Sequence, residues 1–168
     1  FRMGELEAAI GIEQLKKLKN IISKFQKLSH RLIKGLSKLN GLKVPKINKH
    51  FTHSFYAFPM VLDLKELKVN RKKIVDALKA EGVPLGEGYL NIHTLPIFKK
   101  KIAYGTKNFP WKLNNLNKSY KHKKCLIAEE LHNKSYFALG IASYDLSIKD
   151  IDSIIKAFEK VWKSFKFK

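Results

Sequence analysis

The feature that most constrains the fold is a long run of apolar residues repeated at helical spacing. From Glu5 to Leu39 they recur three to five positions apart with lysines between them. This spacing predicts one amphipathic helix, which at this length spans about 50 Å if unbroken and normally crosses between domains or joins a partner. The spacing holds no strict heptad, which disfavours a plain coiled coil. Gly35 and the Asn40–Gly41 pair indicate where the helix ends.

The next segment reads as a strand followed by a capped helix. Residues Ser54–Leu64 are apolar on both faces, as in a strand buried within a sheet. Pro59 argues against a fully paired central position, because proline cannot donate to the hydrogen-bond ladder. Asn70 then predicts the N-cap of a helix over Arg71–Glu81, and Gly82 predicts its end.

The remaining chain alternates short elements with one long polar loop. We expect a short strand and a turn around Gly86 and Gly88, and a loop with one helical turn between Pro96 and Lys124. Further expected elements are a helix over Ile127–Asn133, a strand over Tyr136–Ile141 and a helix that Ser147 caps and that runs to about Phe165.

The chain has a net charge of +20, which invites a nucleic-acid interpretation. The excess is spread along the sequence, and only three of the 34 basic residues are arginines: Arg2, Arg31 and Arg71. Base and phosphate recognition favours the arginine fork, so a solvated lysine surface is the preferred interpretation. The runs Lys99–Lys101 and Lys121–Lys124 could still attract a phosphorylated or nucleotide-linked ligand.

The cysteine and histidine residues limit which cellular compartment and which kinds of site we expect. The single Cys125 cannot form an internal disulfide, which favours a cytoplasmic protein, and we expect it to be a small buried residue rather than a nucleophile. No apolar run reaches the roughly 18 residues of a membrane helix. The six histidines show no metal-ligand spacing, so we expect no metal site.

The chain opens with the segment Phe1–Gly11, FRMGELEAAIG. This segment resembles a junction inside the DegT/DnrJ/StrS family of sugar aminotransferases, which use pyridoxal phosphate (PLP), so we expect the chain to start in mid-protein. The other matching segments are Tyr56–Asp63, Lys79–Val83, Ile92–Pro96, Ala128–Leu131 and Asp150–Asp152. The stretch around Phe109–Trp111 looks like the longer subgroup that acts on keto-sugars or keto-cyclitols.

The resemblance implies an α+β fold for this chain within a fold-type-I PLP enzyme. Residues 1–40 would be the helix that connects to a large domain outside this sequence, and residues 41–168 the small C-terminal domain. Its sheet would be small and mainly antiparallel, with helices on one side. Family members are homodimers with active sites between subunits, and their cofactor lysine lies upstream of this junction. We therefore assign no catalytic residue in this chain.

Three residues are candidate contacts. Arg2 could bind the cofactor phosphate or a carboxylate; the alternative, which we favour slightly, is an ion pair with Glu5 or Glu7 at the start of the helix. The resemblance places His93 near the substrate, where it could hydrogen-bond a sugar hydroxyl or a carboxylate; the alternative is a structural histidine. Tyr89 shares that expectation, against simple aromatic packing.

The resemblance implies amino transfer from glutamate or glutamine to a keto-sugar, taken as nucleotide-linked, in aminosugar or surface polysaccharide biosynthesis. This interpretation includes no nucleic-acid or membrane partner. The alternative from another class is a freestanding basic module that binds nucleic acid or an anionic polymer through its lysines.

Overall fold

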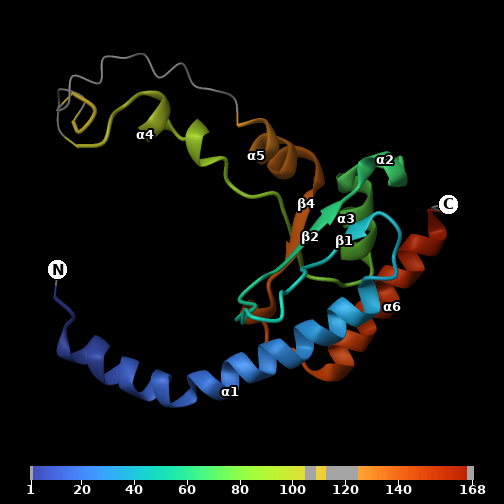
Figure 1. Cartoon of the computed structure of the whole chain (residues 1–168), viewed down its shortest axis with the longest axis horizontal. Coiled ribbons are helices and arrows are strands. Elements are labelled where there is room, and N and C mark those ends of the chain that lie inside the picture. The colour runs from blue at the N-terminus through green and yellow to red at the C-terminus, as the bar shows by residue number, and fades with distance from the viewer. Residues whose placement is uncertain (1, 105–108, 113–124, 166–168) are drawn as a thin grey trace.

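One long helix, α1 (Glu5–Leu36), runs along a whole side of the molecule (Figure 1). The computed structural model describes residues 2–104, 109–112 and 125–165. All buried residues of α1 lie between Leu28 and Leu36, so only its second half contributes to the core. The predicted helix is confirmed, but it ends at Leu36 rather than Leu39, and Gly35 lies inside its last turn.

A four-stranded sheet forms the centre, with strand order β1 (Leu42–Lys43), β2 (Phe58–Leu62), β4 (Tyr136–Leu139), β3 (Leu85–Glu87). Every pairing is antiparallel. Side chains alternate along β2 and β4, so that Phe58, Met60 and Leu62 are buried while their neighbours are only half-buried. The α+β class with a small antiparallel sheet is thus confirmed.

The expectation that Pro59 does not occupy a fully paired central position is confirmed. β2 is a central strand, and Pro59 stands opposite Ala138 of β4. The sheet accepts a proline there because β1 is only two residues long and pairs with Leu62 and Val61 alone. On that side of β2 no ladder reaches Pro59, so no N–H donor is needed.

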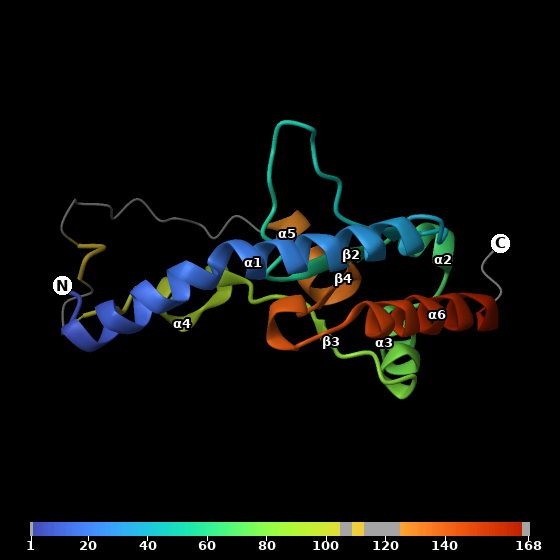
Figure 2. The same ribbon diagram turned by 90° about the horizontal axis from the view of Figure 1, so that it is seen from below.

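Helices cover only one face of the sheet. α3 (Arg71–Ala80) and α6 (Ile148–Ser164) pack there with the second half of α1 (Figure 2). Phe137 of β4 stacks on Phe158 of α6, with ring centroids 6.4 Å apart. A further short helix, α2 (Leu64–Leu67), follows β2. In the part of the chain that the structure describes, the opposite face of the sheet carries no helix (Figure 1).

The predicted helix caps are confirmed. The Asn70 side chain accepts a hydrogen bond from the Lys73 N–H at 2.9 Å. Gly82, two residues after the end of α3, has the left-handed backbone conformation that stops the helix, with φ +85°. Ser147 and Asp150 form a capping box at the start of α6. Local sequence signals therefore determine both ends of α3 and the start of α6.

A second arm leaves the domain opposite the first half of α1. It contains η1 (Ile92–Thr94), α4 (Pro96–Lys99), α5 (Leu126–Glu130) and the π-helical η2 (Leu131–Ser135). The run Lys121–Lys124 falls outside the described residues. Cys125 is exposed and not buried as expected, because it precedes a helix start whose own Leu126 and Ile127 are exposed.

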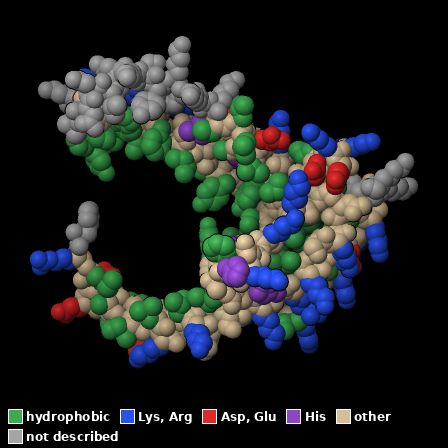
Figure 3. Space-filling model, viewed as in Figure 1, with side chains coloured by type: hydrophobic (Ala, Val, Ile, Leu, Met, Phe, Trp, Pro, Cys, Tyr) green, Lys and Arg blue, Asp and Glu red, His purple; other side chains and the backbone are tan. Residues whose placement is uncertain are grey.

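Figure 3 shows hydrophobic side chains on the sides of the two arms that face each other. On α1 the exposed fractions reach 81% for Leu6, 64% for Ile10 and 69% for Leu15. On the second arm Ile92 and Ile97 are also exposed. Within the described residues no helix is both long and apolar enough to cross a membrane.

Candidate functional site

The open face of the sheet holds a cavity of about 620 Å³. Its floor consists of small residues on adjacent strands and connections: Ala57, Gly86, Ala138 and Gly140. They alternate with buried residues such as Phe58 and Leu139, which point to the helices on the other face. Small side chains on the floor leave the space that larger ones would fill.

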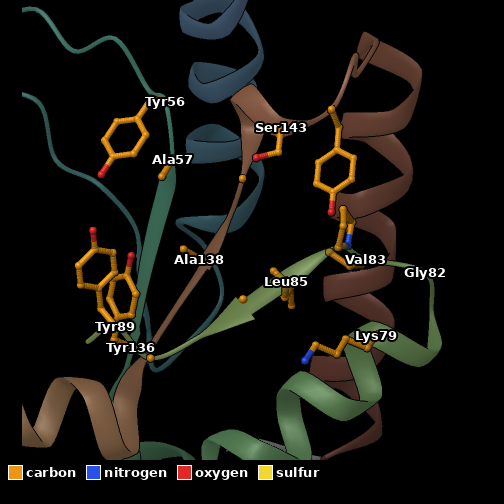
Figure 4. Close-up of a pocket in the computed structure, with 15 residues that line it drawn as sticks. Tyr56, Ala57, Lys79, Gly82, Val83, Leu85, Tyr89, Tyr136, Ala138 and Ser143 are labelled. Atoms are coloured by element: carbon orange, nitrogen blue, oxygen red, sulfur yellow. The ribbon is translucent and has the colours of Figure 1, made fainter. Parts of the chain in front are cut away.

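Three tyrosines gather at one end of this cavity (Figure 4). Tyr56 and Tyr89 are largely exposed, whereas Tyr136 is half-buried. Burial raises the pKa of the Tyr136 phenol, and the neighbouring Tyr56 and Tyr89 raise that pKa further. Tyr136 therefore stays protonated and can donate a hydrogen bond. Aromatic faces with hydroxyl groups suit a flat or ring-shaped polar ligand.

Charged and polar groups mark the other end. Lys79 of α3 points its ammonium toward Glu87, with Nζ 3.2 Å from Oε1. Ser143 and Tyr144, from the connection after β4, also line the cavity. The cavity thus combines an aromatic end with a polar end.

Tyr89 is held in place by its backbone. Its N–H donates to Nδ1 of His132, 2.9 Å away, while the preceding Gly88 N–H donates to the Tyr136 carbonyl at 3.0 Å. Gly88 has φ +66°, and a Cβ there would lie 2.7 Å from the His132 carbonyl oxygen. Only glycine fits this approach. The sequence-predicted Tyr89 is thus fixed at the cavity wall.

His93 lies on η1, outside the residues that line the cavity. Its Nε2 is 3.0 Å from Oε1 of Glu129 on α5, and the two side chains retain 24% and 32% of their exposure. Tyr89 and His93 therefore belong to one segment, but only Tyr89 contacts the cavity.

Arg2 stands apart from both. It is exposed just before α1 and is not among the cavity-lining residues. Among the described residues it forms no ion pair with Glu5 or Glu7. Tyr89 and His93 share one segment of the second arm, whereas Arg2 lies just before α1 on the other arm.

The model of the DegT/DnrJ/EryC1/StrS aminotransferase family matches residues 1–121. The chain belongs to this family. This match confirms the resemblance noted in the sequence. The family is PLP-dependent. Members of the family bind sugars and use the cofactor for amino transfer.

Individual relatives agree with the assignment. The chain is 28% identical over 110 residues to the uncharacterised protein MJ1066 of Methanocaldococcus jannaschii, covering 66% of this chain and 28% of that protein. It is 26% identical over 113 residues to the spore coat polysaccharide biosynthesis protein SpsC of Bacillus subtilis, covering 67% and 29%. The chain therefore spans less than a third of the curated relatives it matches.

A solved structure shows the same fold. PseC of Helicobacter pylori, an aminotransferase involved in the biosynthesis of pseudoaminic acid, superposes with a TM-score of 0.67 at 16% identity. The superposition covers 98% of this chain and 38% of PseC. The α+β arrangement described above is thus part of a larger family architecture.

The described residues do not by themselves complete a cofactor site for this aminotransferase family. None of the described lysines is buried, and Lys79 at the cavity is engaged with Glu87. No described group of three or more His, Cys, Asp or Glu side chains is placed to hold a metal ion.

Sequence reasoning missed several site residues. Tyr136 alternates with the buried Phe137, and that alternation could have placed it on the open face. Glu129 and His132 gave no such signal, because they contact residues 36 and 43 positions away. Their contacts with His93 and Tyr89 form only in the folded chain, where α5 and η2 lie beside the Tyr89–His93 segment.

Proposed function

We propose that this chain is the C-terminal portion of a PLP-dependent aminotransferase that transfers an amino group from glutamate or glutamine to a keto-sugar. The product would enter aminosugar or surface polysaccharide biosynthesis, as the names of SpsC and PseC suggest for those proteins. The observation that carries the proposal is the family match over residues 1–121.

The cavity supports a sugar as the acceptor. Tyr56, Tyr89 and Tyr136 offer ring faces to the apolar side of a sugar and hydroxyl groups to its oxygens, and the cavity floor leaves space for a ring. We assign Tyr89 and His93 to the acceptor and Arg2 to the cofactor phosphate. The nucleotide part of the substrate and the amino donor belong to the same proposal.

The distribution of exposed apolar surface supports the proposed domain division. Residues 1–40 would connect to a large domain, and residues 41–168 would form the small domain. The first half of α1 exposes Leu6, Ile10 and Leu15, which a neighbouring domain would cover. In a homodimer, Arg2 would reach the cofactor of the partner subunit. The cytoplasmic location expected from Cys125 stays a prediction.

Assaying the complete protein tests the proposal. The protein is incubated with PLP, glutamate or glutamine, and a panel of nucleotide-linked keto-sugars, and the aminosugar is identified by mass spectrometry. We expect amination of at least one keto-sugar and stoichiometric formation of the matching 2-oxo acid. Amino exchange between amino acids with no transfer to any sugar would contradict the proposed acceptor class.

The net charge of +20 favours the second candidate, a basic module that binds nucleic acid or another anionic polymer. All described lysines except Lys101 are exposed. A gel-shift titration across salt concentration separates the two, because counterion release makes such binding steeply salt-dependent. Negligible binding at physiological salt supports the enzyme; tight binding that weakens steeply with salt supports the module.

A further inference from the structure

One turn of the second arm carries two side chains that both contact the Tyr89–His93 segment. Glu129, near the end of α5, binds the His93 ring, and His132, at the start of η2, binds the Tyr89 backbone. Residues three apart on a helix project from the same face. The helix is π-type at this point, a geometry frequent at functional sites.

The Glu129 contact determines which nitrogen of His93 carries a hydrogen. An ionised carboxylate only accepts hydrogen bonds, so Nε2, 3.0 Å from Glu129 Oε1, is the donor. In the neutral ring the other nitrogen, Nδ1, is then an acceptor. A group bound at Nδ1 must donate a hydrogen, as a sugar hydroxyl does and a carboxylate does not.

The His132 contact fixes the backbone at Tyr89, four residues before His93. Its Nδ1 accepts the Tyr89 N–H, and its own carbonyl accepts a hydrogen bond from Arg71 Nη1 at 2.7 Å. The same Arg71 nitrogen donates to the Tyr136 carbonyl at 2.9 Å. Arg71 thus ties α3 to both η2 and β4, and Gly88 packs against His132 too closely for a side chain. The Tyr89 backbone is held from both sides.

We infer that Glu129 and His132 are positioning residues for the Tyr89–His93 segment, and that the Glu129 contact leaves Nδ1 as the His93 nitrogen able to accept a hydrogen bond from a ligand hydroxyl. The inference rests on the proposed function for its ligand, but the two contacts are properties of this chain alone. The α5–η2 turn would therefore set both the place of Tyr89 and the hydrogen-bonding sense of His93.

Nuclear magnetic resonance on the complete protein, labelled with ¹⁵N at histidine and tyrosine, tests the two contacts at pH 8 without substrate. Long-range ¹H–¹⁵N spectra report the His93 tautomer, and hydrogen exchange reports the Tyr89 amide. We expect the Nε2–H form in the wild type, a mixed population in Glu129→Ala, and no change in the control Glu130→Ala. Glu130 has the same charge on the same helix, but no described ion pair.

His132→Leu should speed exchange of the Tyr89 amide at least about tenfold. His132→Asn should restore protection, because its side-chain oxygen can accept at the place of Nδ1. An unchanged His93 tautomer in Glu129→Ala, or an unchanged Tyr89 amide in His132→Leu, would overturn the positioning role.

Kinetics of the complete protein test the ligand part separately. Glu129→Ala should lower kcat/KM for the keto-sugar about tenfold and leave the half-reaction with the amino donor near wild type. If the spectra change as expected but the keto-sugar kinetics do not, the contacts stand and the acceptor role of His93 is overturned. If the wild type aminates no keto-sugar, the proposed function itself fails.

Discussion

Gly35 of α1 faces Ile155 of α6 with no room for a methyl group between them. A Cβ at Gly35 would lie 2.6 Å from Cδ1 and 2.9 Å from Cγ1 of Ile155. The close approach explains why a glycine stands inside a helix, where it ordinarily weakens the structure. Isoleucine has one strongly preferred χ1 rotamer in a helix, so the side chain cannot simply turn away.

Gly35→Ala should therefore destabilise the chain. The substitution gains about 1 kcal/mol of helix propensity, but overpacking costs about 1–3 kcal/mol. We expect a net loss of about 1 kcal/mol in the free energy of unfolding, measured by urea titration. In an Ile155→Ala background the same change should stabilise by about 0.5–1 kcal/mol. Stabilisation in both backgrounds would show that the helices do not limit each other at this point.

Acid should destabilise the fold through paired carboxylates. Hydrogen bonds and the charge of Arg31 lower the pKa of Asp152, and Lys43 lowers the pKa of Asp63 in the same way. A lowered pKa means that the folded state binds fewer protons than the unfolded state. The stabilisation is thus complete above the ordinary aspartate pKa of about 3.9 and is lost as pH falls through the lower folded values.

We expect Tm to be nearly constant from pH 7 to 5 and to fall below about pH 4. Asp152→Asn should have a lower Tm at pH 7, since it leaves Arg31 without its bidentate partner, and a shallower fall in acid. Tm curves for the variant and the wild type that run parallel throughout would contradict the assignment of this pair.

The elements that the sequence predicted well are those with local signals. The cap at Asn70, the glycine stop at Gly82 and the capping box at Ser147 each involve residues within a few positions of one another. The amphipathic spacing of α1 is equally local. These local patterns predict the structure well because tertiary packing does not change the element, but only determines which of its faces is buried.

The failures concern partners distant in sequence. The two-residue length of β1, which leaves one side of Pro59 unpaired, follows from strand pairing rather than from composition, so the sequence did not indicate it. Glu129 and His132 contact the acceptor segment across the excursion of the second arm. The tyrosine cluster likewise draws Tyr56, Tyr89 and Tyr136 from three parts of the chain.

The chain alone should not bind PLP covalently. None of the described lysines is buried, and the family resemblance implies that the cofactor lysine lies upstream of this segment. After incubation with PLP and desalting, we expect no stoichiometric visible absorbance band. A persistent band that disappears on substitution of one particular lysine would place a cofactor site within this chain.

The isolated chain should self-associate. Leu6, Ile10 and Leu15 expose an apolar stripe on α1, and such patches drive association. Sedimentation velocity should show oligomers at moderate concentration. Leu6→Gln with Ile10→Gln should shift the chain toward monomer, whereas the matched pair Lys17→Gln and Lys19→Gln should not. A monomeric, cooperatively unfolding wild type would mean that this stripe needs no neighbouring domain.

His93 offers the sharpest test of the acceptor site in the complete enzyme. If His93 hydrogen-bonds the keto-sugar, His93→Ala removes one directional hydrogen bond and should cost about 1–3 kcal/mol in kcat/KM for that substrate. The half-reaction with the amino donor should change little, because the donor does not use this contact. A structural histidine would behave differently: losing its bond to Glu129 would lower Tm and depress both half-reactions together. Equal losses with a lower Tm would therefore remove His93 from the substrate site.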